Sequence, residues 1–442
     1  MDAFETLTAE IAAVRHTYVM GRVSEIGRGL LQVRGLSREA RLGDRVAIGP
    51  PAAERIGGEV IGLTPERAAI LPDAPMEGAA IGEAVELAGR ADIHPHAGWI
   101  GRVVDAFGEP LDGRPLRRGP RARKLRATAP AAATRRRLGG RLATGVAAFD
   151  TLLPLVRGQR MGLFAGSGVG KSMLLGKFAC GVEADVVVIA LIGERGRELR
   201  EFTERVLGPA GMARAVVVAA TSDQSPLIRR RAAWAAMAVA EHFRDEGRHV
   251  LLLVDSITRF AEAHREVAMA AGEEGALRGW PPSVAHLIMA LAERAGPGPE
   301  GAGDITAVLS VLVPGSDMEE PVADILRGVL DGHVVLDRAI AERGRFPAVD
   351  LLRSVSRSLP EAASETENAL IGRARALLGA YARAELMIQA GLYSAGSDPL
   401  VDAAVRVWPA LDGFLAEASP GGIAASFARL EECLGPVRRM PA

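Results

Sequence analysis

Lysine is almost absent from this chain of 442 residues, which has only Lys124, Lys171 and Lys177 beside fifty arginines. Because arginine supplies the general positive charge, each remaining lysine is a candidate for a position that needs a compact ammonium instead of a planar guanidinium. Net charge is nearly absent too, since 53 basic residues stand against 54 acidic ones. That balance argues against a protein that coats nucleic acid along its whole surface.

Cysteines, aromatic residues and long apolar runs are also scarce. The two cysteines, Cys180 and Cys433, give neither a metal-binding spacing nor a disulfide framework, as is typical of a reducing cytoplasm. The longest apolar runs have the length of strands and fall far short of the roughly 20 residues of a membrane span. The N-terminus carries Asp2, Glu5 and Glu10 and lacks the apolar core of a secretory signal. With 48% hydrophobic and 24% charged residues, the composition predicts a soluble globular protein.

Three changes of texture along the chain predict an α/β protein with three domains. Short β-type runs fill residues 20–90 and predict a small β-barrel within an N-terminal domain, 1–90. Residues 91–360 alternate apolar strands with helices, which predicts a parallel sheet covered on both faces. Residues 361–442 predict a C-terminal helical domain. We expect core strands at 160–164, 185–192, 215–220, 249–254 and 305–313, and C-terminal helices at 363–390, 399–418 and 423–434.

The strongest motif is a phosphate-binding loop, Ala165-Gly166-Ser167-Gly168-Val169-Gly170-Lys171-Ser172. It follows a predicted strand and opens a predicted helix, so backbone N–H groups and the helix N-terminus converge on phosphate oxygens. Lys171 is expected to reach the β- and γ-phosphates of ATP, and the Ser172 hydroxyl to bind Mg²⁺. Ala165 replaces the glycine that is usual at the first position. The alternative is a glycine-rich turn with an accidental lysine, which the flanking strand and helix argue against.

Two acids stand at the ends of predicted core strands. Asp255 ends the run at 250–254 and is expected to hold Mg²⁺ through water, although many strands also end in Asp as a turn former. Glu194 ends the strand at 185–192, at the sheet edge where a nucleotide is expected. A carboxylate there can orient water for in-line attack on the γ-phosphate. From spacing alone, a helix-capping acid paired with Arg197 is an equal alternative for Glu194.

Several segments together resemble the rotary-ATPase family, and in particular its flagellar protein-export branch. They are RGQRMGLFAGSGVGKS at 157–172, GERGRE at 193–198, LDGHVVL at 330–336, FPAVD at 346–350 and GSDPL at 396–400. The resemblance extends over nearly the whole chain, including GRVVDAFG at 101–108 and the N-terminal barrel. It implies a RecA-like P-loop core between the barrel and the helical domain, and a homohexamer that hydrolyses ATP with Mg²⁺ at its subunit interfaces.

The resemblance also implies roles for four further residues. Glu194 matches the water-activating glutamate, and Arg195 resembles an arginine that braces the phosphate pocket, with a structural ion pair as the alternative. Arg357, in Ser354-Val355-Ser356-Arg357, resembles the arginine finger, which neutralises charge on a neighbouring subunit's γ-phosphate. Phe346 falls where the family places a ring against adenine, and an ordinary core phenylalanine is the alternative.

One chain must therefore offer Lys171 and Glu194 on one face and Arg357 on another, which a closed head-to-tail ring satisfies. The implied function is ATP hydrolysis that energises protein export through a flagellar type III secretion apparatus. Alternatives are a virulence-type secretion ATPase, a catalytic subunit of a rotary ATP synthase, an RNA-dependent hexameric translocase and a non-catalytic nucleotide-binding subunit. The presence of Lys171, Glu194, Asp255 and Arg357 in one chain argues against the last of these.

The implied partners are a stator-like regulatory protein, a coiled-coil stalk protein, the membrane export gate and chaperone–cargo complexes, at the cytoplasmic side of the inner membrane. Residues 2–15 are the candidate stator contact, with a frayed terminus as the alternative. The basic connector at 114–141 lacks the interleaved aromatic rings of a single-strand binding groove. We expect it to be a solvated linker; contact with acidic lipid head groups or an acidic partner comes second, and nucleic acid last.

Overall fold

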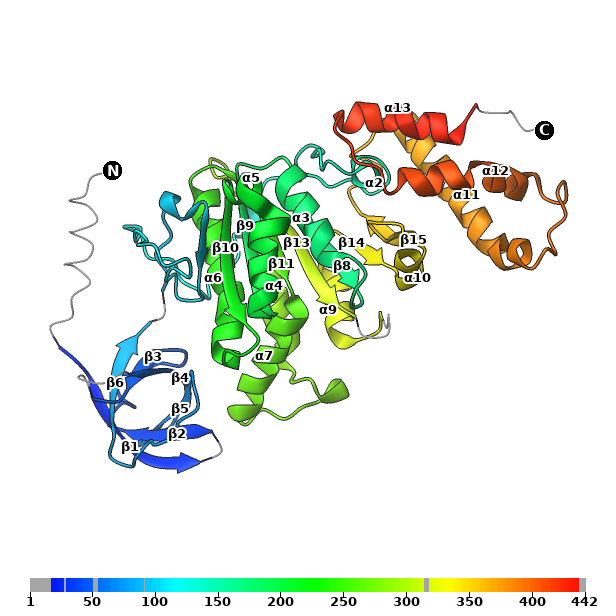
Figure 1. Ribbon diagram of the computed structural model, residues 1–442. Coiled ribbons are helices and arrows are strands. Elements are labelled where there is room, and N and C mark those ends of the chain that lie inside the picture. Colours follow the sequence, from blue (N-terminus) through cyan, green and yellow to red (C-terminus); the bar gives the residue numbers. More distant parts are fainter. Residues whose placement is uncertain (1–16, 28, 51–54, 91, 314–317, 437–442) are drawn as a thin grey trace.

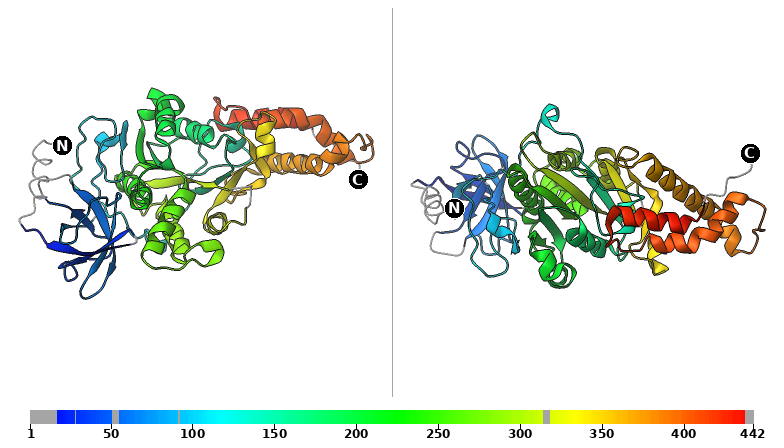
Figure 2. Two further views of the ribbon diagram at one scale, coloured as in Figure 1. Left: turned by 60° about the horizontal axis from the view of Figure 1, so that its bottom comes forward. Right: turned by 90° about the horizontal axis from the view of Figure 1, so that it is seen from above.

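The computed structural model describes residues 17–27, 29–50, 55–90, 92–313 and 318–436, which form three regions in a row (Figure 1). The barrel, the sheet and the C-terminal helices follow one another along an elongated molecule, and the other two views show the same order (Figure 2). The candidate stator contact at 2–15 lies outside the described residues. Within them, no helix combines the length and apolar character needed to cross a membrane.

The N-terminal region is a closed barrel of six antiparallel strands in the order β1-β2-β5-β4-β3-β6. Side chains alternate between its interior and solvent, and Val33, Val60, Ile70 and Val85 are fully buried in it. The predicted small β-barrel is therefore confirmed. The strands are β1 (Met20–Gly27), β2 (Leu30–Arg34), β3 (Arg45–Ile48), β4 (Ile56–Leu63), β5 (Ala68–Pro72) and β6 (Ala84–Gly89).

The central sheet has the order β15-β14-β8-β13-β11-β9-β10-β7, with the short β12 beside β13. It is parallel except for β15 and β12, and all five predicted core strands are present as β8, β9, β10, β11 and β13. The sequence pattern did not predict β7, β14 or β15. The bounds are β7 (Arg102–Val104), β8 (Arg160–Ala165), β9 (Val186–Glu194), β10 (Ala215–Thr221), β11 (His249–Asp255), β12 (Gly296–Pro297), β13 (Asp304–Leu312), β14 (Gly332–Leu336) and β15 (Val349–Ser356).

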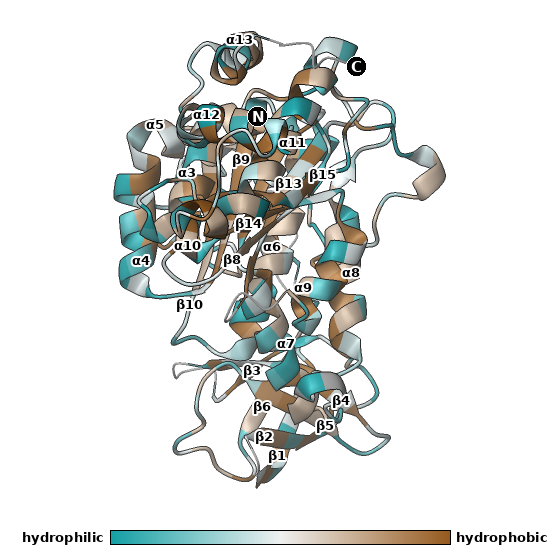
Figure 3. Cartoon of the chain, turned by 90° about the vertical axis from the view of Figure 1, so that its right-hand side faces the viewer, coloured by the Kyte–Doolittle hydropathy of each residue, from teal (hydrophilic) through white to brown (hydrophobic). Residues whose placement is uncertain are grey.

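Helices cover both faces of this sheet, so alternate residues of one strand enter two separate cores. On β9, Val187, Ile189 and Leu191 face α3, whereas Val188 and Ala190 face α6 and α7. Figure 3 shows hydrophobic colour concentrated on the strands and hydrophilic colour on the outer helix α4. The helices are α2 (Ala147–Asp150), α3 (Lys171–Gly181), α4 (Gly196–Glu201), a π-helix (Phe202–Leu207), α5 (Gly208–Met212), α6 (Pro226–Asp245), α7 (Ile257–Ala270), α8 (Ser283–Arg294), α9 (Pro321–Val329) and α10 (Arg338–Glu342). Three short 3₁₀ turns lie at Ala97–Trp99, Ala132–Thr134 and Leu277–Gly279.

The C-terminal region consists of the three predicted helices, α11 (Glu365–Gln389), α12 (Pro399–Phe414) and α13 (Gly422–Leu434). Ser364 and Glu367 form a reciprocal capping box at the start of α11, and the Asp398 side chain caps α12 ahead of Pro399. These caps satisfy backbone N–H groups that helices leave unpaired at their first turn. The sequence signals that mark the starts of α11 and α12 therefore lie within a few residues of each start.

Most residues of the basic connector at 114–141 are exposed, as expected of a solvated linker, but some of its arginines bind the core. Arg135 binds the Glu293 carboxylate and carbonyl, and Arg136 binds the Asp304 carboxylate and the Gly298 carbonyl. These partners are buried or half-buried acids and carbonyls at the amino-terminal edge of the sheet, more than 150 residues away in sequence. Local composition cannot reveal partners at that separation.

Candidate functional site

The phosphate-binding loop turns sharply between β8 and α3, as the motif predicts. Gly168 and Gly170 have φ values of 78° and 85°, a left-handed conformation that residues with a side chain rarely adopt. A Cβ atom on Gly170 would also lie 2.9 Å from Cδ1 of Phe346. The loop therefore needs glycine at this position for two reasons, and the half-buried Phe346 ring lies against the loop.

Lys171 and Asp255 meet at the carboxyl-terminal edge of the sheet. The Lys171 ammonium forms an ion pair with the Asp255 carboxylate, which also accepts a 2.8 Å hydrogen bond from the Ser310 hydroxyl. Asp255 is only 3% exposed and ends β11, whereas Lys171 begins α3. These groups open into a cavity of about 830 Å³, which the Ser172 and Glu194 side chains also line.

Glu194 lies in the same cavity, at the end of β9, and its side chain forms a hydrogen bond with Glu198 of α4. Burial, the hydrogen bond with Glu198 and the nearby charge of Asp255 raise the pKa of Glu194 to about 7, although Lys171 opposes the shift. The same hydrogen bond lowers the pKa of Glu198. A carboxyl with a pKa near neutrality can accept a proton from water efficiently. The alternative pairing of Glu194 with Arg197 does not occur among the described residues, where Arg197 is exposed.

Two arginines complete the lining of the cavity. Arg195 precedes α4, and its side chain is 75% exposed and lies 3.7 Å from the Glu198 carboxylate. Arg259, which the sequence did not single out, lies in the first turn of α7 and packs its side chain against Gly193. The sequence could have pointed to Arg259, because it lies only four residues after Asp255. A helix that follows the carboxyl end of a strand starts at this edge of a parallel sheet, so its first turn lies near the site.

The donor set at this edge suits Mg²⁺ together with a polyphosphate. Mg²⁺ prefers oxygen ligands and usually takes one or two protein groups, keeping waters and substrate phosphates for the rest. The Ser172 hydroxyl and the Asp255 carboxylate supply those groups, and within the described residues no cluster of three acids or imidazoles competes for a metal. Carboxylates outnumber cationic side chains in the lining, so a polyphosphate needs a divalent cation here. The carboxylates are Glu194, Glu198, Glu201 and Asp255, and the cationic side chains are Lys171, Arg195 and Arg259.

Arg357 is the predicted site residue that the structure places elsewhere. It follows β15, and its backbone N–H donates a 2.9 Å hydrogen bond to the carbonyl of Asp331, whose own N–H bonds the Arg160 carbonyl at the start of β8. Arg357 thus lies at the amino-terminal end of β8, and the phosphate loop lies at the carboxyl-terminal end. Six residues of strand separate the two ends, about 20 Å at roughly 3.3 Å per residue. The exposed guanidinium cannot reach the cavity of its own chain.

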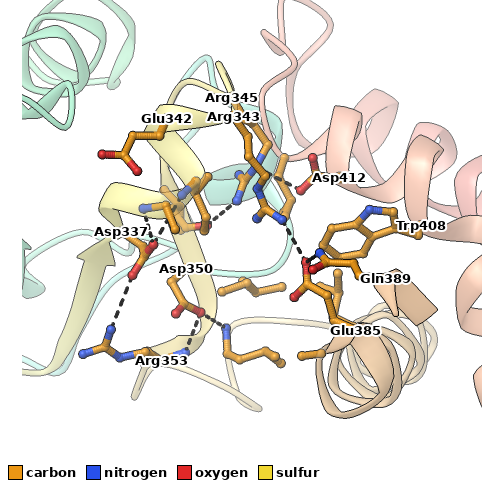
Figure 4. A pocket seen from close by; sticks show the side chains of 18 residues that line it. Asp337, Glu342, Arg343, Arg345, Asp350, Arg353, Glu385, Gln389, Trp408 and Asp412 are labelled. Carbon is orange, nitrogen blue, oxygen red and sulfur yellow. Dashed lines mark hydrogen bonds and ion pairs between the residues drawn. The ribbon is translucent and has the colours of Figure 1, made fainter. Parts of the chain in front are cut away.

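A second cavity, of about 670 Å³, lies between the β15 edge of the core and the C-terminal helices (Figure 4). Ion pairs cross it, because Arg343 binds Glu385 of α11 at 3.2 Å and Arg345 binds Asp412 of α12 at 3.0 Å. Its lining contains neither glycine nor lysine, so it lacks the backbone cradle that a phosphate chain requires. We assign the nucleotide to the first cavity for this reason.

Comparison with known proteins agrees with this geometry. Residues 145–356 match the ATP synthase alpha/beta family nucleotide-binding domain, and residues 363–431 match the EscN ATPase C-terminal domain of type III secretion systems. The flagellum-specific ATP synthase of Caulobacter vibrioides is 44% identical over 93% of this chain and 94% of its own. The chain belongs to the flagellar and type III secretion ATPase family.

Other members of this ATPase family are nearly as similar over the whole length. The type 3 secretion system ATPase of Pseudomonas syringae pv. syringae is 41% identical over 94% of this chain and 92% of its own. The assembled ATPase EscN of enteropathogenic E. coli superposes with a TM-score of 0.87 at 35% identity, covering 94% of this chain and 100% of EscN. EscN in complex with its central stalk EscO gives a TM-score of 0.85, with the same identity and coverage. The fold class expected from sequence is therefore confirmed, and the chain is an ATPase whose activity energises type III export.

Proposed function

We propose that this ATPase hydrolyses Mg²⁺-bound ATP in the 830 Å³ cavity and so energises flagellar protein export. The observation that carries the proposal is the convergence of Lys171, Glu194 and Asp255, which come from the ends of three different elements onto one glycine-rich loop. A bound Mg²⁺ supplies charge neutralisation at the phosphates and would be held by the Ser172 hydroxyl and, through water, by Asp255.

The residues of this cavity have distinct roles in the proposed reaction. Lys171 leaves its ion pair with Asp255 to bind the β- and γ-phosphates, and the backbone of residues 165–170 holds the remaining oxygens. Glu194 orients the attacking water and accepts its proton, for which its raised pKa is suited. Arg195 braces the pocket from its rim, and the Phe346 ring beside Gly170 stacks on adenine.

The separation of Arg357 from this cavity favours a ring in which each site is completed by the next chain. An arginine finger at the γ-phosphate stabilises charge in phosphoryl transfer, and Arg357 can serve in this way only at a neighbour's site. Head-to-tail contacts of this kind close into a ring or grow without limit, so we propose a closed homohexamer. The assembled state of the related EscN supports this ring.

The same relatives guide the remaining assignments. We propose that residues 1–90, 91–360 and 361–442 act as barrel, ATP-binding and helical domains, and that a coiled-coil stalk occupies the ring, as EscN binds the central stalk EscO. Flagellar relatives at 42–46% identity, against 41% for virulence-type ones, favour the flagellar apparatus. A stator-like regulator, the export gate, chaperone–cargo complexes and attachment beneath the inner membrane complete the proposal.

A complementation experiment tests this function. The chain is expressed in a flagellated bacterium that lacks its own export ATPase, and secretion of hook and filament subunits is measured. Native chain should restore secretion, whereas Glu194→Gln, which leaves the fold intact, should not. Restoration of needle secretion alone, in a strain that lacks a virulence-type ATPase, would move the assignment to the virulence branch. Single-stranded RNA should leave phosphate release by the purified chain unchanged, because stimulation would indicate a translocase.

A further inference from the structure

We propose that Gln159 is a positioning residue for Arg357: its buried side-chain amide fixes the finger segment to the strand that carries the phosphate loop. The proposal rests on the proposed role of Arg357 at the neighbouring site. Gln159 falls within the segment 157–172 that carries the family resemblance, but the sequence assigns it no role; it lies one residue before β8 and is fully buried.

Every hydrogen-bonding group of the Gln159 amide is used. The oxygen accepts a 2.9 Å hydrogen bond from the backbone N–H of Val156, so the nitrogen must be the atom that faces the finger segment. That nitrogen donates to the Asp331 carbonyl at 3.1 Å and to the Ser356 hydroxyl at 3.0 Å. A buried amide with all its partners in place is rigid, because leaving any of these groups unpaired is costly.

These two acceptors hold Arg357 from both sides. Ser356 is the residue directly before Arg357, and its hydroxyl also donates to the Pro154 carbonyl at 2.7 Å. The Asp331 carbonyl accepts the Arg357 backbone N–H as well as the Gln159 amide. Gln159 therefore bonds directly to the two groups that fix where the Arg357 backbone lies.

The Arg357 side chain itself is held by far less. It is exposed, and its Nη2 donates a 3.2 Å hydrogen bond to the Arg327 carbonyl in the last turn of α9. The reach of the guanidinium toward another subunit is then set by its backbone. A displacement of about 1 Å at a group that positions a reactant can slow a reaction by about 10²-fold.

Asp331, which binds the Arg357 backbone, is itself bound to the start of β8, so Arg357 and the phosphate loop are attached to the same strand. Arg160 begins β8, and its backbone N–H and guanidinium bind the Asp331 carboxylate at 2.9–3.1 Å. Strand β8 then runs without interruption to Ala165, where the loop begins. The phosphate loop and the finger segment are thus attached to the two ends of one strand.

The test mixes subunits that are defective in different halves of the site. Gln159→Met keeps the length of the side chain but removes the donors to Asp331 and Ser356. Alone, it should lower kcat by about 10- to 100-fold, with ATP affinity close to that of the native chain. The melting temperature should fall, because the buried N–H of Val156 loses its acceptor. In rings mixed equally with Lys171→Ala, about a quarter of the interfaces pair an intact loop with an intact finger. Phosphate release should therefore recover.

Controls distinguish the positioning role from a structural one. Gln389 is exposed on α11, where its amide donates to the Glu385 carboxylate at 3.3 Å, so Gln389→Met should leave kcat within twofold. The double variant Gln159→Met/Arg357→Ala should be no slower than Arg357→Ala alone, since both act through one group. Ser356→Ala carries the same expectations as Gln159→Met, so the test stands if the latter fails to fold.

Recovery in mixtures of Arg357→Ala with Lys171→Ala, but none with Gln159→Met, would overturn the positioning role and leave the proposed function intact. In that case Gln159 acts on its own subunit's site or on the fold. Failure of both mixtures, in rings that native mass spectrometry shows to be mixed, would remove the finger role of Arg357 and the role of Gln159 with it. A fall in ATP affinity for Gln159→Met equal to its fall in kcat would also contradict the proposal.

Discussion

The two ends of strand β8 differ in what surrounds them: one opens into a cavity, and the other is held by a network of hydrogen bonds. At its carboxyl-terminal end, glycines open a cavity in which Lys171, Glu194 and Asp255 meet, and the pKa of Glu194 rises to about 7. At its amino-terminal end, several groups of the protein bind the Asp331 carboxylate and the Gln159 amide, and the exposed Arg357 side chain lies at the edge.

This difference shows where binding and where positioning are located in the molecule. Charged groups that line a cavity can exchange a protein partner for a ligand, and perturbed pKa values cluster at functional sites. Groups whose hydrogen bonds are all made within the protein do not bind a ligand, so they can hold another residue in place. Substitutions at the two ends should therefore fail in different ways: those at the carboxyl end within their own subunit, those at the amino end in the neighbour's site.

The largest effect is expected for Glu194→Gln, which removes the base but keeps the shape of the side chain. Phosphate release should fall by about 10²–10⁴-fold while ATP still binds. Glu204→Gln is the matched control, because Glu204 lies on the exposed surface in an ion pair with Arg200. Normal turnover by Glu194→Gln would show that another group activates the water.

Lys171→Ala should follow, with a loss of about 10²–10³-fold in turnover and weaker ATP binding, since one preorganised cation at the phosphates disappears. Lys177 lies on the same helix, is exposed, and gives the control Lys177→Ala, which should be close to native. Lys171→Arg should also fail, because a planar fork does not replace a compact ammonium in a tight loop. A fluorescent ATP analogue and phosphate release measure both effects.

A pH profile gives the next effect in size. The raised pKa of Glu194 means that the reactive carboxylate form is lost as the pH falls through about 7, so kcat/KM for ATP should decline there. Glu198→Ala removes the hydrogen bond that raises the Glu194 pKa, and should move this decline to lower pH. If kcat/KM of Glu198→Ala declines at the same pH as that of the native chain, the decline reports the titration of a group other than Glu194.

At the amino-terminal edge the expected effect is on stability. Asp304 is buried and binds Arg136 at 2.7 Å together with Arg157. Asp304→Asn should lower the free energy of unfolding by about 1.5–3 kcal/mol, the range for a hydrogen bond to a charged group. The affinity for ATP in the absence of urea should stay unchanged. Arg200→Ala breaks an exposed pair and should cost less than about 0.5 kcal/mol. Equal losses in urea unfolding would contradict the contrast between buried and exposed pairs.

The sequence predicted those parts of the molecule whose signals are local. The apolar runs of β9 and β11 identified the parallel sheet, and the glycines before Lys171 identified the loop, because each pattern lies within about ten residues. The edge strands β14 and β15 were not predicted: β14 is short, and β15 carries exposed Leu352 and Val355 among its apolar positions.

Contacts between distant residues could not be predicted. The connector arginines Arg135 and Arg136 find their carboxylates more than 150 residues away. Gln159 lies in the segment 157–172 that carries the resemblance, but its role could not be predicted, since a buried amide and an exposed one look alike in a sequence. The roles of Glu194, Arg195, Phe346 and Arg357 came from the resemblance and stay predictions, although the structure places the first three around the loop and Arg357 apart from it.

The central claim is that one chain supplies the two halves of the active site from opposite ends of one strand, and subunit mixing tests it most directly. Phosphate release is measured while Arg357→Ala and Lys171→Ala chains are combined in varying proportion. Each alone should be nearly silent, and the mixture should reach its maximum near equal proportion, where about a quarter of head-to-tail interfaces are complete. Rings shown to be mixed that stay silent at every proportion would contradict the account.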